Sequence, residues 1–146
     1  MSWKVRLGWL LVLALPTSVI AAERDPIQPR VPKDQMEAAK AVTNPVPMTP
    51  ENVAVGEGLY RGKGTCFVCH GEKGLGDGPA AVGFDPSPRN FTNGAFHQAR
   101  TDGELMWVLK NGSPGTAMVP LVGSVITEEE GWKILLYERS LAQGAK

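Results

Sequence analysis

The chain has 146 residues, with 15 basic and 15 acidic side chains that give a formal net charge of zero. It contains no basic run or stripe, which argues against a protein that binds nucleic acid or an anionic membrane surface. A length of this order corresponds to a single domain.

The first segment has the layout of a secretory signal peptide, which we predict at residues 1–22. Lys4 and Arg6 precede an apolar run, and the small residues Ala21 and Ala22 follow it. The run is short and is interrupted by a proline, which disfavours a membrane span; an uncleaved anchor remains the alternative. We therefore expect a periplasmic or otherwise extracytoplasmic protein, whose net charge becomes −2 when Lys4 and Arg6 are removed.

Residues 23–48 are predicted to form a proline-rich extended arm. The prolines spread through this region prevent a long helix or a central strand, and only residues 33–42 suit a short helix. The arm is interpreted either as a passive tether or as a strap that lies on a partner subunit. The core is then expected to come from the rest of the chain, residues 49–146.

Three main helices are predicted in residues 49–146. Each begins at a threonine that can cap its first turn, and each carries apolar residues at helical spacing. The starts are Thr49, Thr101 and Thr127, and the helices are expected to end near residues 63, 111 and 144. The second and third starts have the pattern of a capping box.

The stretches between these helices are rich in glycine, proline, asparagine and aspartate, which predicts loops without regular structure. Three short helices and long loops offer too little apolar surface for a self-sufficient core at this size. Long loops of this kind usually surround something inside the fold. The sequence therefore predicts that a bulky apolar group is enclosed.

Both cysteines lie in the stretch CFVCH, as Cys66 and Cys69, and His70 follows directly. A disulfide between these cysteines would close a very small loop and leave His70 without a role. Zinc would require a fourth ligand and usually a second cysteine pair, and adjacent ligands suit one tetrahedron poorly. Both chemistries remain alternatives to covalent haem attachment.

The spacing C-x-x-C-H is the attachment signature of haem c. Two thiols three positions apart can bond to two vinyl groups of one porphyrin, and the next residue can bind the iron. The macrocycle would also supply the apolar mass that the chain lacks. We therefore predict one haem c, bound covalently through Cys66 and Cys69, with His70 as one iron ligand.

The second axial ligand is predicted to be Met118. It lies in NGSPGTAMVPL, a glycine- and proline-rich loop that can approach the haem closely, so its thioether is poorly explained as core filler. Met106 sits among apolar helix residues and is interpreted as a core side chain. His97 or an open site are the alternatives.

Several stretches resemble a class I cytochrome c of the small bacterial type. Besides CFVCH and the GTAMVP loop, Gly56 and Tyr60 match the glycine-x-x-x-aromatic pattern of the family's first helix. Ile134 and Tyr137 match its C-terminal counterpart. The resemblance covers residues 49–143 and implies an all-α cytochrome c fold, in which three main helices and long Gly/Pro-rich loops wrap around one haem.

A finer resemblance links the chain to the monohaem cytochrome subunits of bacterial respiratory complexes, such as alternative complex III. The matching features are the proline-rich lead-in, then GxxLY and CHGxxGxGDGP. This resemblance implies a fixed electron-transfer subunit of a membrane oxidoreductase, docked through residues 23–48, as the alternative to a free carrier.

The resemblance also implies that Arg89 and Asn90 contact the haem propionates, because small cytochromes make such contacts at this distance after the motif. With His70 and Met118 on the iron, no position is left for a substrate. The expected function is single-electron transfer between respiratory redox partners, without catalysis. An open iron site that binds peroxide or a diatomic gas is the remaining alternative.

Overall fold

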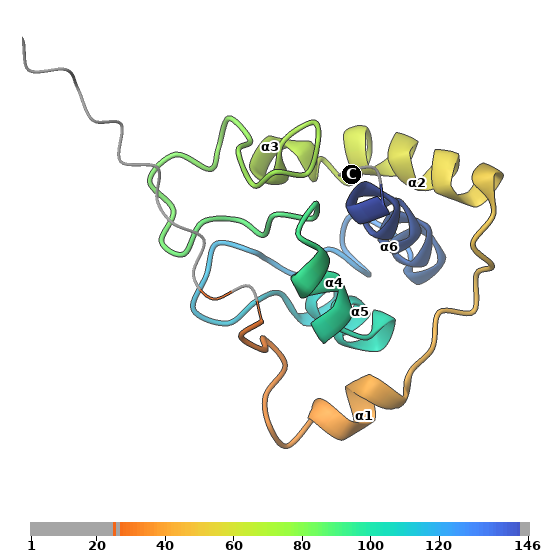
Figure 1. Ribbon diagram of the computed structural model, residues 1–146, viewed down its shortest axis with the longest axis horizontal. Helices are drawn as coiled ribbons and strands as arrows, with labels where there is room; N and C mark the ends of the chain where they lie inside the picture. Colours follow the sequence, from red (N-terminus) through yellow and green to blue (C-terminus); the bar gives the residue numbers. More distant parts are fainter. Residues whose placement is uncertain (1–24, 26, 144–146) are drawn as a thin grey trace, which may run out of the picture.

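The computed structural model describes residue 25 and residues 27–143, and the predicted signal peptide at residues 1–22 lies outside this part. Here the chain forms helices joined by long loops (Figure 1), and its one β-type pairing is an isolated bridge between Val122 and Ile126. The fold is therefore all-α, as predicted. The helices are α1 (Met36–Ala41), α2 (Pro50–Arg61), α3 (Phe67–His70), α4 (Gly94–Ala99), α5 (Asp102–Asn111) and α6 (Glu128–Gln143).

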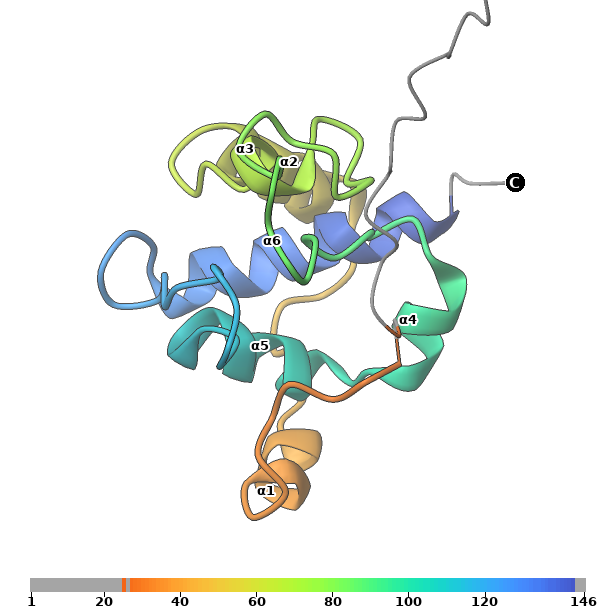
Figure 2. The same cartoon turned by 90° about the vertical axis from the view of Figure 1, so that its left-hand side faces the viewer.

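Helices α2 and α6 cross and form the frame of the fold (Figures 1 and 2). The crossing is close because Gly56 of α2 packs against the backbone of α6 at Lys133. Tyr60, one turn further along α2, is buried, and its ring meets that of Tyr137 edge-on with 5.2 Å between the ring centroids. The Tyr60 hydroxyl donates to the Gly71 carbonyl oxygen at 2.8 Å, which ties α2 to the loop after α3.

The predicted starts of the three main helices are confirmed by their caps. Thr49 Oγ1 accepts a hydrogen bond from the backbone N–H of the third helical residue of α2 at 3.2 Å. Thr101 and Glu104 form the predicted capping box at the start of α5. Thr127 and Glu130 make the same reciprocal pair at the start of α6. Local hydrogen bonds of this kind decide where each helix begins.

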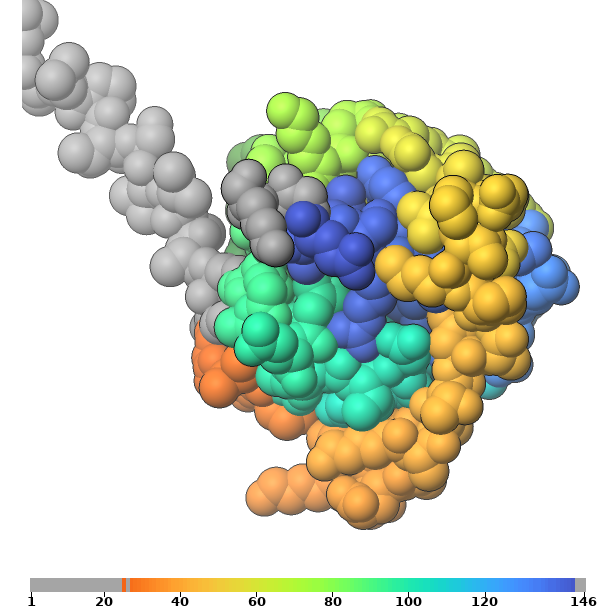
Figure 3. Space-filling model, turned by 45° about the vertical axis from the view of Figure 1, so that its right-hand side comes forward, coloured from red at the N-terminus to blue at the C-terminus, as the bar shows by residue number. Residues whose placement is uncertain are grey.

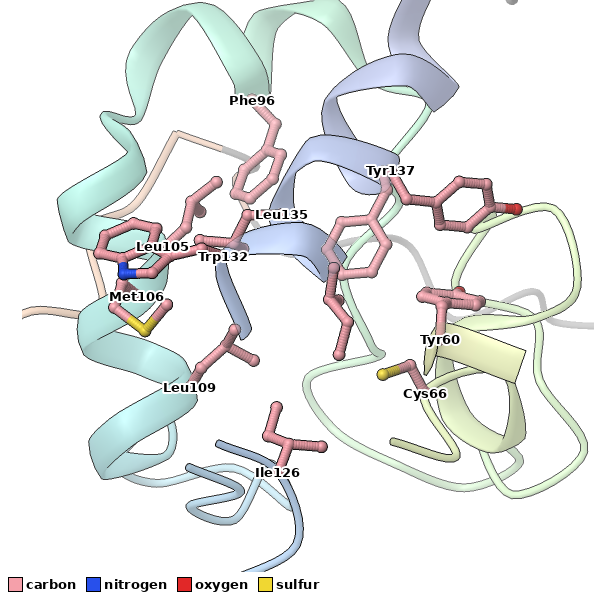
Figure 4. Close-up of a cluster of buried hydrophobic side chains, with 12 residues drawn as sticks. Tyr60, Cys66, Phe96, Leu105, Met106, Leu109, Ile126, Trp132, Leu135 and Tyr137 are labelled. Atoms are coloured by element: carbon pink, nitrogen blue, oxygen red, sulfur yellow. The ribbon is translucent and has the colours of Figure 1, made fainter. Parts of the chain in front are cut away.

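The hydrophobic core lies between α5 and α6 and reaches to α2 (Figure 4). Leu105, Met106 and Leu109 of α5 face Trp132 and Leu135 of α6, and all five side chains are buried. Met106 is thus a core residue, as the apolar helix around it indicated. The same cluster includes Cys66, which approaches it from the side of α2.

Helices α3 and α4 have no counterpart among the predicted helices. They contain four and six residues, which is too short for a clear apolar period. The side chain of Asn93 caps α4 by accepting from two backbone N–H groups of its first turn. Helix α3 coincides with the cysteine–histidine motif, so the motif itself carries this local structure.

The arm at residues 23–48 wraps around the outside of the domain along α5 (Figure 3), as far as the structure describes it. The short helix predicted within residues 33–42 is present as α1, and it packs against α5. Val31 and Ala39 are each only 6% exposed. The arm therefore contributes buried side chains to the domain, although the buried residues of the central core cluster all lie between residues 60 and 137.

Candidate functional site

In the described part of the chain, a cavity of about 240 Å³ opens between α3, α5 and α6. Residues from the loop segments 84–91 and 113–121 complete its walls, together with Arg30 and Val31 of the arm. Five of the six predicted site residues line this cavity: Cys66, Cys69, His70, Arg89 and Met118.

Helix α3 brings both cysteines to the cavity wall. Cys66 occupies the position before its first residue and Cys69 lies three residues later, so both belong to one side of the helix. The two thiols are free, and no disulfide joins them. Burial raises the pKa of the Cys66 thiol to about 12. In the residues that the structure describes, no cluster of three or more histidine, cysteine, aspartate or glutamate side chains is arranged to hold a metal ion.

His70 is oriented by the loop that faces it. Its ring nitrogen Nδ1 lies 3.0 Å from the carbonyl oxygen of Arg89, and a carbonyl oxygen can only accept, so Nδ1 carries the proton. The lone pair is therefore on Nε2, so the ring is in a tautomer that can bind a metal through Nε2. Burial lowers the pKa of the imidazole to about 4, and the Phe91 ring stacks on it with 4.4 Å between centroids.

The glycine-rich stretch 71–80 packs on α3 and supports it from behind. The N–H groups of Gly76 and Gly78 donate to the carbonyl oxygens of His70 and Cys69 at 2.8 and 3.1 Å. A Cβ at Gly78 would lie 2.6 Å from the carbonyl carbon of Cys69, so this close approach needs glycine. This stretch therefore holds the motif helix in place, while residues of the segments 84–91 and 113–121 line the cavity.

The loop that carries Met118 is held by its own backbone. The Met118 carbonyl oxygen accepts from the Ser113 N–H at 2.9 Å, and the Met118 N–H donates to Thr116 Oγ1 at 3.1 Å. The loop is closed onto α5 by the Leu121 N–H, which donates to the Leu109 carbonyl oxygen at 2.9 Å. A partly buried thioether is thus held at the wall of the same cavity as His70.

His97, the alternative to Met118, has both ring nitrogens engaged elsewhere. Nε2 lies 2.7 Å from the Phe91 carbonyl oxygen and Nδ1 lies 3.2 Å from the Arg139 guanidinium. These contacts assign the proton to Nε2 and the acceptor role to Nδ1, so neither nitrogen is directed to the cavity. Of these two residues, only Met118 lines the cavity.

Arg89 and Asn90 are placed differently from each other. Arg89 lines the cavity, and its guanidinium lies over the Phe96 ring at 5.4 Å from the centroid. The Asn90 side chain oxygen accepts from the N–H and the hydroxyl of Thr92 at 2.9 and 2.7 Å. Asn90 is not among the residues that line the cavity. Its side chain oxygen instead stabilises the local turn at Thr92.

Four charged cavity residues were missed as site residues by the sequence interpretation. Arg30 belongs to the arm, and Arg100 forms a buried ion pair with Glu104 at 3.3 Å. Glu138 lies on α6 and is 4% exposed. Glu104 was predicted only as part of a capping box, and the other three belong to no motif. The only signal for Glu138 was a charged residue next to the apolar ILLY run of the last helix.

Glu138 gives a prediction for the pH dependence of stability. Burial raises the pKa of its carboxyl from 4.5 to about 8, and the neighbouring Arg139 offsets part of this rise. The folded protein keeps this proton up to about pH 8, whereas the unfolded chain loses it near pH 4.5. The free energy of unfolding of the haem-loaded protein should therefore fall between these pH values, by on the order of 4 kcal/mol.

Substituting Glu138→Gln should remove this fall, so that the variant gains stability over the unsubstituted protein as pH rises from 5 to 8. Chemical denaturation at each pH measures the difference. Glu129→Gln, which changes an exposed carboxylate on the same helix, serves as the control and should leave the pH profile nearly unchanged. Parallel profiles for Glu138→Gln and the unsubstituted protein would contradict the prediction.

The residues of the cavity fit a covalently attached haem. Two thiols on one side of a helix, an imidazole with its lone pair on Nε2 and a thioether all line one space. Leucine and phenylalanine side chains supply an apolar wall, and the arginines supply positive charge that suits the two propionate carboxylates.

Comparisons with known proteins point the same way. The family described as cytochrome c oxidase, cbb3-type, subunit III matches residues 51–137. Among solved structures, the chain is similar to a chain of the reducing HAO-like protein complex of Kuenenia stuttgartiensis, at 29% sequence identity and a TM-score of 0.57. That match covers 66% of this chain but 46% of the other, so this protein spans about half the length of its structural neighbour. A comparison with curated proteins gave no match.

Proposed function

Because this chain belongs to the cytochrome c family described as cytochrome c oxidase, cbb3-type, subunit III, we propose that it carries single electrons between respiratory redox partners through one haem c. Membership of the family implies a haem protein that transfers electrons. The proposal adds the number of haems, the residues that bind the iron and the redox partners. The chain has a single C-x-x-C-H motif, which uses both of its cysteines and supports one haem.

Cys66 and Cys69 would hold the haem covalently, and His70 and Met118 would bind the iron. The hydrogen bond from His70 Nδ1 to the Arg89 carbonyl oxygen carries this assignment, because it leaves Nε2 as the metal-binding nitrogen in the cavity that the cysteines line. Arg89 is proposed to contact a propionate, since its side chain also lines the cavity. For Asn90 the same role has less support, because its side chain oxygen is bonded to Thr92.

When bound, the haem would supply a one-electron couple of iron, and the protein would set the properties of that couple. His70 is held in one tautomer and Met118 in one loop position, so neither ligand needs to rearrange during electron transfer. A thioether ligand raises the potential relative to a second histidine. If His70 and Met118 both bind the iron, no site for a substrate would remain on it, and we propose a carrier without catalytic activity of its own.

The proposed location is periplasmic or otherwise extracytoplasmic. The support is the signal-peptide pattern of residues 1–22 and the attachment of haem c outside the cytoplasm. No helix in the described residues is both long enough and apolar enough to cross a bilayer.

A second candidate function is a fixed electron-transfer subunit of a membrane oxidoreductase. The observation that favours it is the structural neighbour, which is part of a multi-protein complex. Purification of the protein from membranes in mild detergent tests this candidate. Stoichiometric co-purification with other redox subunits would support it, and recovery of a monomer from the soluble fraction would support the free carrier.

The double variant Cys66→Ala, Cys69→Ala is the direct test of haem attachment. Expressed with a haem c maturation system, the unsubstituted protein should retain one haem on denaturation, detected as added mass and as the absorption of a reduced c-type haem. The double variant should lose this covalent haem completely. Cys69→Ala alone is the matched control and should keep one thioether bond. A colourless unsubstituted protein would contradict the proposed function.

A further inference from the structure

We propose that residues 27–35 form a strap that closes the haem cavity and keeps water from the haem. Val31 would form part of the cavity wall, and the Arg89 side chain would hold the strap in place through hydrogen bonds. This inference rests on the proposed function, because it places a haem in the cavity. It assigns the arm a task within its own domain, in place of the tether or docking strap that the sequence indicated.

The strap forms part of the cavity wall. Val31 is 6% exposed although it lies in a segment without regular structure, and it lines the cavity together with Arg30. The residues on either side are more exposed, including Gln28 and Lys33. A single buried valine in a segment of otherwise half-buried and exposed residues indicates that the segment is pressed onto the domain at this position.

The fastening of the strap involves the residue that also orients His70. The Arg89 guanidinium donates to the carbonyl oxygens of Asp25 and Gln28 at 3.1 and 2.9 Å, while the Arg89 carbonyl oxygen accepts from His70 Nδ1. Arg100 donates to the carbonyl oxygen of Ile27. Arginine presents several donors in a rigid fork. Two arginines therefore hold the backbone carbonyls of Ile27 and Gln28 in the strap and of Asp25 just before it.

The other end of the strap is fastened to α5. The Trp107 indole N–H donates to the Gln35 side chain oxygen at 2.8 Å. Just beyond, α1 approaches α5 closely at Gly103, where a Cβ would lie 2.9 Å from the Val42 Cβ. The strap is thus tied on both sides of Val31, by arginines before it and by the α1–α5 contact after it.

Exclusion of water is the physical effect of this closure. A haem exposed to water favours the more highly charged oxidised state, so a dry cavity raises the potential. The strap would therefore support the potential that the Met118 ligand sets.

Proton NMR of the haem-loaded protein in its two oxidation states tests the inference. If Val31 packs against the haem, its methyl resonances should move between the reduced and the oxidised protein, because the unpaired electron of ferric iron shifts nearby protons. The methyl groups of Val42, which is 45% exposed and does not line the cavity, should move far less. Equal shifts for the two valines would overturn the proposal.

A pair of substitutions tests the effect on the potential. Val31→Asp places a carboxylate in the cavity wall and should lower the midpoint potential, because a negative charge stabilises the oxidised haem. Val42→Asp makes the same change on the arm outside the cavity and should leave the potential unchanged. An unchanged potential in Val31→Asp would overturn the strap, whereas absence of covalent haem in the unsubstituted protein would overturn the proposed function instead.

Discussion

Substituting Gly56→Ala should destabilise the haem-loaded protein by at least about 3 kcal/mol. A Cβ at this position would lie 2.7 Å from the carbonyl carbon of Lys133, closer still to its oxygen, and 3.2 Å from the Tyr137 Cβ. These are backbone and Cβ atoms of α6, so no side chain rotation can relieve the overlap. The two helices would have to separate, which would loosen the packing of Tyr60 against Tyr137.

Gly58→Ala is the matched control in the same helix. A Cβ at Gly58 meets nothing within 4 Å, and alanine is the better helix former, so this variant should gain roughly 0.5–1 kcal/mol. Chemical denaturation of both purified variants, followed by far-ultraviolet circular dichroism, measures the two changes. A very low yield of haem-loaded Gly56→Ala would agree with the prediction, and equal stability of the two variants would contradict it.

The cytochrome c family of this protein could be predicted from the sequence because its motif is short and local. Cys66, Cys69 and His70 lie within five positions, and one turn of helix is enough to bring them to one cavity. The helix starts were also local, since each capping threonine bonds only to its own first turn. Met118 stood out because a methionine in a glycine- and proline-rich loop has little core to fill.

The role of the arm could not be read in this way, because it depends on contacts between distant residues. Arg89 and the arm carbonyls that it binds are separated by more than 60 positions, and a backbone carbonyl leaves no trace in a sequence. The burial of Glu138 depends likewise on the packing of α6 beside the cavity. The helix starts and the cysteine–histidine motif, which depend on residues within one turn, were therefore predicted, whereas the contacts of the arm and the burial of Glu138 were not.

Substituting Met118→His should lower the midpoint potential by on the order of 0.1 V or more. Imidazole stabilises ferric iron more than a thioether does, and the backbone of residues 113–121 would hold the new side chain at the same wall of the cavity. Potentiometric titration, followed by the absorption of the reduced haem, measures the change. The titration should remain a one-electron curve, because the number of haems is unaffected.

Met106→Leu is the control for this prediction, since Met106 is 2% exposed and packs between α5 and α6 away from the cavity. Its potential should equal that of the unsubstituted protein. Met118→Ala extends the test, because removal of the thioether should open the iron to carbon monoxide in the reduced state. If the unsubstituted reduced protein binds carbon monoxide rapidly at neutral pH, Met118 is not a ligand, and the alternative of an open site for peroxide or a diatomic gas takes the place of electron carriage.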